Sequence, residues 1–233
     1  MKSFIIALAS LFIGCIVFAQ QRPPVISSPD VNADGSVTFR YFSRTAQTVL
    51  LKGEFLSAPL PFVKDTSGIW SVTVKDIKPD IYPYSINVDN VELADPNNTY
   101  VFANERFKRS ILDVPGKTPL VHSLQNVPHG KISYRYYNSA TLGTTRQLLV
   151  YTPPGFNPNS KTKYPVLYLI HGGSDTEETW TKVGNANFIA DNLIPQGKAV
   201  PMIIVMPYGN VRPKPMPDFT KDVINDIIPF IEA

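Results

Sequence analysis

Residues 163–180 read KYPVLYLIHGGSDTEETW, and this stretch decides how the second half of the chain folds. Residues 166–170 form a short apolar run rich in strand-forming side chains, and Pro165 precedes it. Such a run predicts a strand that is buried on both faces, as in a parallel sheet. Gly172 and Gly173 follow, and glycine accepts the backbone angles that a sharp turn out of a strand often requires.

His171, Gly172 and Gly173 directly after a strand are typical of the loop that begins the oxyanion hole of an α/β-hydrolase. Backbone N–H groups in such a loop point to where a tetrahedral intermediate carries its negative charge. The alternative is a strand-to-helix turn without chemistry. His171 and Ser174 are close in sequence, but no neighbour is placed to orient the imidazole as in a catalytic pair. We therefore expect His171 to fix the loop through hydrogen bonds, and Ser174 to cap the next helix or to contribute an N–H group.

An acyl-transfer site also needs a nucleophile, a base and an acid that orients the base. In α/β-hydrolases a serine in a G-x-S-x-G turn comes first, then Asp or Glu, then His. This sequence has no such turn after His171. Ser174 is the last serine, no histidine follows His171, and no cysteine follows Cys15. We therefore expect no catalytic residue in this chain, with the nucleophile, the acid and the histidine beyond Ala233.

The composition is that of a globular protein, and 233 residues predict two domains of ordinary size. The 22 prolines favour a loop-rich β domain over a helical bundle. A formal net charge of +3 is too weak to indicate binding to nucleic acid. His129 is expected to pack at the domain junction, and His122 is an ordinary loop residue. Neither has a second histidine or carboxylate at metal-ligand spacing, so we expect no metal and no cofactor.

The N-terminus has the pattern of a targeting segment. Lys2 supplies the positive charge, and residues 4–18 are almost wholly apolar. This predicts a signal peptide over residues 1–19 with cleavage after Ala19, and a secreted or periplasmic protein with no membrane contact after cleavage. A transmembrane anchor is the alternative, but the run is shorter than the ~20 residues that a span requires. A lipoprotein attached through Cys15 is less favoured, because the apolar run continues past that cysteine.

Residues 31–114, after a polar lead-in over residues 20–30, carry the pattern of short strands separated by turns. Runs with strand-forming residues predict strands over residues 37–42, 48–52, 69–74 and 81–88. This density of strands and turn signals is typical of a β-sandwich.

The same segment resembles a family-48 carbohydrate-binding module, an Ig-like sandwich of the early-set type. The resemblance covers residues 53–98 and is carried by Gly53-Glu54-Phe55, Gly68-Ile69-Trp70, Tyr82-Pro83-Tyr84, Val88-Asp89 and Asp95-Pro96. It implies glycan binding, for which Trp70, Tyr82 and Tyr84 are candidate stacking residues. The alternative is that this alternating aromatic stripe forms the core of the sandwich.

A linker over residues 115–130 leads to a second domain over residues 131–233, where strands and helices alternate. The sequence predicts strands over residues 132–137, 147–151, 166–170 and 202–206, and a helix over residues 186–194. Phe219, Val223, Ile227 and Ile231 predict a last helix with one apolar stripe, bent near Pro229. This order is the beginning of a doubly wound sheet, here an incomplete α/β-hydrolase.

The second domain resembles the esterase D-like group of carbohydrate esterase family 1, which contains feruloyl and acetylxylan esterases. The resemblance is carried by Leu142-Gly143-Thr144-Thr145-Arg146, Tyr151-Thr152-Pro153-Pro154-Gly155, His171-Gly172-Gly173, Trp180 and Val205-Met206-Pro207-Tyr208-Gly209. It implies that the backbone N–H groups of Gly172, Gly173 and Ser174 form the oxyanion hole. The serine elbow, Asp and His of the family all lie beyond Ala233, so the sequence resembles the N-terminal portion of such an esterase.

The leading hypothesis is an exported serine esterase that removes feruloyl or acetyl groups from plant polysaccharide. The 233 residues alone are expected to be inactive, and to expose a sheet edge that later strands would cover. One alternative is a non-catalytic carbohydrate-binding or scaffold protein, and another is an exported α/β-hydrolase peptidase.

Overall fold

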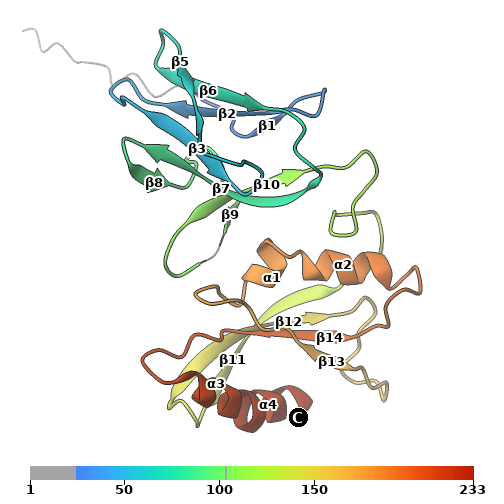
Figure 1. Cartoon of the computed structure of the whole chain (residues 1–233). Coiled ribbons are helices and arrows are strands. Elements are labelled where there is room, and N and C mark those ends of the chain that lie inside the picture. The colour runs from blue at the N-terminus through green and yellow to red at the C-terminus, as the bar shows by residue number, and fades with distance from the viewer. Residues whose placement is uncertain (1–24, 103) are drawn as a thin grey trace, which may run out of the picture.

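The computed structural model describes residues 25–102 and 104–233, and it forms two units joined by a linker (Figure 1). Strands β1 to β10 make the first unit, and β11 to α4 make the second. The predicted signal peptide over residues 1–19, its cleavage site and Cys15 lie outside the described residues. Within these residues, no helix is both long enough and apolar enough to cross a bilayer.

The first unit consists of two antiparallel sheets, which confirms the prediction of an all-β sandwich. One sheet has the order β1-β2-β6-β5, with β1 at Asp30–Val31, β2 at Val37–Phe42, β6 at Ile69–Val74 and β5 at Val63–Lys64. The other has the order β4-β3-β7-β10-β9, with β4 at Leu60–Pro61, β3 at Val49–Gly53, β7 at Asp80–Val88, β10 at Arg109–Val114 and β9 at Val101–Phe102. Strand β8 (Val91–Leu93) pairs with β7.

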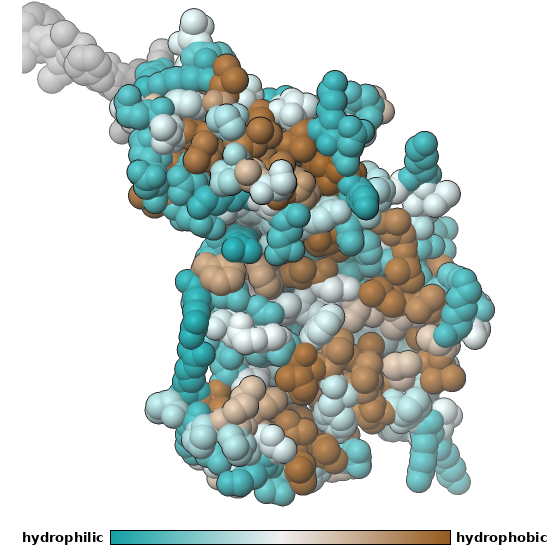
Figure 2. Space-filling view, viewed as in Figure 1, coloured by the Kyte–Doolittle hydropathy of each residue, from teal (hydrophilic) through white to brown (hydrophobic). Residues whose placement is uncertain are grey.

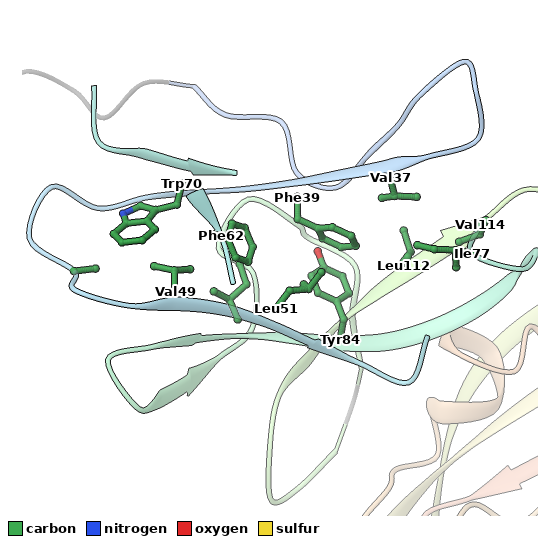
Figure 3. Close-up of a cluster of buried hydrophobic side chains, with 12 residues drawn as sticks. Val37, Phe39, Val49, Leu51, Phe62, Trp70, Ile77, Tyr84, Leu112 and Val114 are labelled. Carbon is green, nitrogen blue, oxygen red and sulfur yellow. The ribbon is translucent and has the colours of Figure 1, made fainter. Parts of the chain in front are cut away.

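The core of the sandwich lies between these sheets (Figure 3). Phe39 of the first sheet meets Tyr84 of the second with ring centroids 5.0 Å apart in an edge-on arrangement. Both side chains are fully buried, as is Leu51 beside them. Full burial of one large apolar side chain stabilises a fold by roughly 1.5–3 kcal/mol, so these contacts fix how the two sheets stack.

The second unit is a four-stranded mixed sheet with helices on both faces (Figure 1), the beginning of the predicted doubly wound sheet. Its order is β11-β12-β14-β13, with β11 at Lys131–Ser139, β12 at Thr144–Thr152, β14 at Ile203–Pro207 and β13 at Val166–Tyr168. β13 and β14 are parallel, and the other pairs are antiparallel. α1 (Thr179–Lys182) and α2 (Ala186–Leu193) lie on one face, and α3 (Met216–Asp222), the π-helix η1 (Val223–Ile227) and α4 (Ile228–Glu232) lie on the other.

The last helical segment carries the predicted apolar stripe, but a π-helical turn replaces the simple bend expected near Pro229. The N–H of Ile228 donates to the carbonyl of Val223, five residues back. Pro229 has no N–H for the next helical bond, so the hydrogen-bond pattern changes just before it. Phe219 and Ile227 remain buried against the sheet, so the turn keeps the stripe on one face.

The expectation that β13 is buried on both faces is wrong. Leu167 at its centre is 43% exposed, because β13 is an edge strand of the described sheet and pairs with β14 alone. Val166 and Tyr168 pack inward while Leu167 points to the opposite face. Figure 2 shows hydrophobic residues gathered on the side of this unit that carries β13, and Leu167 and Ile170 are among the exposed apolar side chains.

Candidate functional site

The candidate site lies where two parallel strands end. β13 leads into the loop that contains His171, and β14 leads into Tyr208 and Gly209. Because β13 and β14 are parallel neighbours, their carboxyl ends meet at the same edge of the sheet. In open α/β sheets, ligands bind outside the carboxyl ends of the strands.

His171 ties the two loops together. The N–H of Gly209 donates to His171 Nε2 over 2.8 Å, so that nitrogen must carry a lone pair. Nδ1 lies 2.7 Å from the carbonyl oxygen of Gly172 and therefore carries the proton. With both ring nitrogens engaged, the neutral imidazole holds the loops in position, as the sequence predicts, and acts as neither base nor metal ligand in this arrangement.

Gly172, Gly173 and Ser174 form a tight turn after His171. The N–H of Asp175 donates to the carbonyl of Gly172 over 3.2 Å, and Ser174 is held in the left-handed region at φ 66°. A Cβ atom on Gly172 would come within 3.0 Å of the Asp175 carboxylate, so a larger residue there would push this side chain aside. Within the described residues, the N–H groups of Gly172, Gly173 and Ser174 donate to no protein acceptor. Ser174 is buried and caps no helix, since the N-cap of α1 is Glu178.

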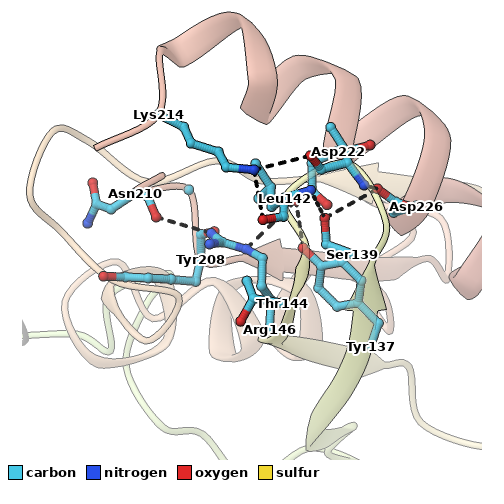
Figure 4. Close-up of polar contacts among 12 residues, drawn as sticks. Tyr137, Ser139, Leu142, Thr144, Arg146, Tyr208, Asn210, Lys214, Asp222 and Asp226 are labelled. Atoms are coloured by element: carbon cyan, nitrogen blue, oxygen red, sulfur yellow. Dashed lines mark hydrogen bonds and ion pairs between the residues drawn. The ribbon is translucent and has the colours of Figure 1, made fainter. Parts of the chain in front are cut away.

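Arg146 of β12 supports the loop after β14 from beneath (Figure 4). Its guanidinium donates to the carbonyl oxygens of Tyr208 and, over 3.2 Å, of Asn210. Its Nε lies 3.8 Å from the carboxylate of Asp222, which is fully buried and accepts the Tyr137 hydroxyl over 2.7 Å. Burial, with Asp222 beside it, raises the pKa of the Tyr137 hydroxyl, so this hydroxyl stays protonated and donates to the carboxylate.

The contacts of His129 lie in the linker and on α2, and it has a carboxylate partner that sequence spacing does not reveal. Its Nδ1 lies 2.9 Å from the Asp191 carboxylate of α2, and that carboxylate also accepts the Tyr151 hydroxyl and the N–H of Gly130. Among residues 25–102 and 104–233, no group of three or more His, Cys, Asp or Glu side chains could hold a metal ion.

The three aromatic residues considered for glycan stacking belong to the sandwich core. Tyr84 is fully buried, and its hydroxyl donates to Asp95 over 2.9 Å. Trp70 is 7% exposed and donates its indole N–H to the carbonyl of Ser43. Tyr82 is partly buried against the same core. The structure therefore favours the core interpretation over a sugar-stacking platform for these rings.

A different aromatic residue of the first unit is open to solvent. Phe107, in the loop between β9 and β10, is 45% exposed, and the guanidinium of Arg109 lies 4.7 Å from its ring centroid. It lines a groove of about 810 Å³ with Tyr41 and the charged residues Glu92 and Arg106. Phe107 falls outside any alternating strand pattern, so the sequence gives no signal that would single it out.

Two family models match the chain. Residues 27–100 match carbohydrate-binding module 48 (isoamylase N-terminal domain). Residues 139–225 match the putative esterase family. The second match contains both loops of the candidate site.

Two curated relatives are larger proteins. The chain is 30% identical over 218 residues to an endo-1,4-beta-xylanase/feruloyl esterase of Xylanibacter ruminicola, a match that covers 88% of this chain and 30% of the relative. It is 34% identical over 90 residues to endo-1,4-beta-xylanase Y of Acetivibrio thermocellus, which covers 38% of this chain and 8% of the relative. The chain thus spans less than a third of either relative.

Among solved structures, the enterobactin esterase of Shigella flexneri matches with a TM-score of 0.61 at 15% identity, covering 84% of this chain and 60% of that one. The ferric enterobactin esterase of Salmonella typhimurium matches with a TM-score of 0.56 at 14% identity, covering 88% and 63%. At this identity the likeness shows the fold alone. The chain carries a family-48 carbohydrate-binding module domain followed by a domain of the putative esterase family.

Proposed function

We propose that this protein is an exported carbohydrate esterase that hydrolyses feruloyl or acetyl esters on plant polysaccharide. The observation that carries the proposal is the turn after β13, where three consecutive N–H groups donate to no acceptor among residues 25–102 and 104–233 and His171 bonds to the backbone of this turn. The feruloyl esterase relative, 30% identical over 218 residues, supports the choice of substrate class.

In this proposal, the N–H groups of Gly172, Gly173 and Ser174 donate hydrogen bonds to the ester carbonyl oxygen as negative charge develops on it. The attacking group is a serine, which forms an acyl-enzyme that water then hydrolyses. Removal of one such donor typically costs about 2.7–4 kcal/mol of transition-state stabilisation, so the turn would contribute much of the rate. The serine, the acid and the catalytic histidine would come from sequence outside these 233 residues, which alone would be inactive.

Export is part of the same proposal. Residues 1–19 would direct secretion, with cleavage after Ala19, and lipidation at Cys15 would be the alternative. N-terminal sequencing of the exported protein distinguishes these routes, since cleavage after Ala19 gives a chain that begins at Gln20.

The decisive experiment is the purification of the protein exported by the native cell, followed by intact mass measurement and a substrate panel. The expected mass is well above the 25.9 kDa of this sequence, with release of ferulate or acetate from polysaccharide. Hydrolysis of peptides instead of esters would favour the peptidase alternative. Robust ester hydrolysis by residues 20–233 alone would refute the assignment of the nucleophile to other sequence.

A non-catalytic glycan-binding protein is the second candidate, favoured by the groove that contains Phe107. An exposed aromatic ring beside charged side chains can stack on a sugar ring while the charges bind its hydroxyl groups. Phe107→Ala should weaken retention on polysaccharide about tenfold, whereas Trp70→Phe should change retention little. Retention without any ester hydrolysis by the exported protein would favour this candidate over the esterase.

A further inference from the structure

The connection between β9 and β10 reaches from the sandwich to the turn of the candidate site. Asn104 and Asp175 form an isolated antiparallel bridge between the two units. Asn104 is 2% exposed although it lies in a connecting loop, and such burial of a polar residue requires hydrogen-bond partners. The partners lie on both units, so this residue joins the sandwich to the turn after β13.

Both polar atoms of the Asn104 side-chain amide form hydrogen bonds. Its Nδ2 donates to the Asp175 carboxylate over 2.8 Å, and its Oδ1 accepts the N–H of Arg106 over 2.9 Å within its own loop. The next residue adds a backbone bond, because the N–H of Glu105 donates to the carbonyl of Ser174 over 2.7 Å. The loop is therefore held in shape by its own hydrogen bond and bonded to two consecutive residues of the turn.

These bonds act on a strained part of the backbone. Ser174 occupies the left-handed region, which costs a non-glycine residue energy that its surroundings must offset. Its carbonyl is held by Glu105 of the sandwich, and the carbonyl of Asp175 accepts Asn210 Nδ2 over 2.8 Å from the loop after β14. Release of Asp175 from Asn104 would free one side of the turn, and the direction of the preceding N–H groups would change with it.

We propose that Asn104 of the sandwich is a positioning residue for the oxyanion turn, acting through Asp175. The inference rests on the proposed esterase function, and it gives the carbohydrate-binding-module domain a second role. In addition to any contact with glycan, this domain positions the turn of the catalytic site, so catalysis depends on both units.

The test uses a pair of reciprocal substitutions in the full-length exported protein. Asn104→Asp keeps the acceptor for the N–H of Arg106 but removes the donor to Asp175 and places two carboxylates together. We expect kcat on a small soluble aryl ester to fall by about 10- to 100-fold with KM within about twofold, because a displaced catalytic group affects the transition state. Adding Asp175→Asn restores an amide facing a carboxylate, and kcat should return to within about threefold of wild type.

Tyr100→Phe is the matched control. Tyr100 donates its hydroxyl to the carbonyl of Lys182, so the variant also loses a hydrogen bond between the two units, but one that does not touch the turn. It should keep wild-type kcat. A fall in kcat equal to that of Asn104→Asp would mean that general loosening of the interface, rather than position of the turn, limits the rate.

Hydrogen exchange of the Asp175 and Thr176 amides, which donate to the Gly172 carbonyl and the Thr179 hydroxyl, separates the two proposals when it is measured on the same proteins. Asn104→Asp should speed exchange there, and the double variant should reverse the change. A wild-type protein that hydrolyses no ester refutes the proposed function, whatever the exchange shows. An active wild type whose kcat and exchange are both unchanged by Asn104→Asp overturns the positioning role.

Discussion

Removal of the Asp191 carboxylate should destabilise the second unit specifically. This carboxylate is 1% exposed and accepts three donors: the Tyr151 hydroxyl over 2.7 Å, the N–H of Gly130 over 2.8 Å and His129 Nδ1 over 2.9 Å. It therefore joins helix α2 to strand β12 and to the end of the linker. Asp191→Ala leaves all three donors without their acceptor.

The size of the effect follows from which donors stay buried. The imidazole of His129 is 37% exposed and can turn to water, and Gly130 is only partly buried, whereas Tyr151 is fully buried. Each buried donor left unpaired costs about 1–3 kcal/mol, and relief from burying a charge offsets part of this cost. One fully buried donor is left unpaired, so we expect a net loss of about 1–3 kcal/mol in the free energy of unfolding. Tyr151→Phe removes one donor but keeps the carboxylate, so its cost should be near 1 kcal/mol.

Urea unfolding followed by tryptophan fluorescence can isolate this unit. The chain has two tryptophans, Trp70 in the sandwich and Trp180 in the second unit, so a Trp70→Phe background reports the second unit alone. With a urea m-value of about 1–3 kcal/mol per M, Asp191→Ala should lower the midpoint by about 1 M. A shift equivalent to less than about 0.5 kcal/mol would refute the reasoning, because it would mean that water satisfies the Tyr151 hydroxyl that the structure buries.

Three further predictions concern single hydrogen-bond networks. Burial disfavours the charged form of Asp226, but hydrogen bonds, the strongest from Thr141, favour it more and lower the pKa of this carboxyl. Asp226→Asn should therefore be less stable than wild type at neutral pH. That difference should disappear as the pH falls through the lowered pKa, and urea midpoints across a pH series measure it; a constant difference would contradict the assignment. Tyr84→Phe removes a donor to the buried Asp95 and should cost the sandwich about 1–2 kcal/mol, read from Trp70 fluorescence in a Trp180→Phe background. In the exported protein, His171→Ala should lower kcat on an ester by about tenfold or more, because it frees the loops after β13 and β14. An unchanged kcat would mean that His171 does not position the site.

Elements with a regular side-chain period were predictable from the sequence. Strands β2 and β6 begin and end where their apolar alternation does, and the stripe from Phe219 to Ile231 marks the face of the last helical segment that packs on the sheet. Position within a sheet is harder to predict. The apolar run at Leu167 has the composition of a central strand, yet a strand's place in the order depends on partners elsewhere in the chain, and β13 has one described partner.

The candidate site was predictable only in part, because some of its contacts also depend on partners far away in the sequence. His171 and its two glycines form a local motif, so their turn could be recognised from sequence. Asn104 and Asp175 are 71 residues apart, and a contact between two loops leaves no periodicity in either. The partnership of His129 with Asp191 is equally invisible, because it depends on where helix α2 is placed.

The strand order of the second unit has a consequence for folding kinetics. β11 and β12 pair through a short turn at Gly143, so this hairpin can form early from local contacts. β12 and β13 follow each other in the chain but are not neighbours, because β14 lies between them. β13 therefore has no place in the sheet until the chain has continued past Pro207 and β14 has docked on β12. Long-range pairing of this kind is slow, and the turn at His171 should be among the last parts of the unit to reach its final geometry.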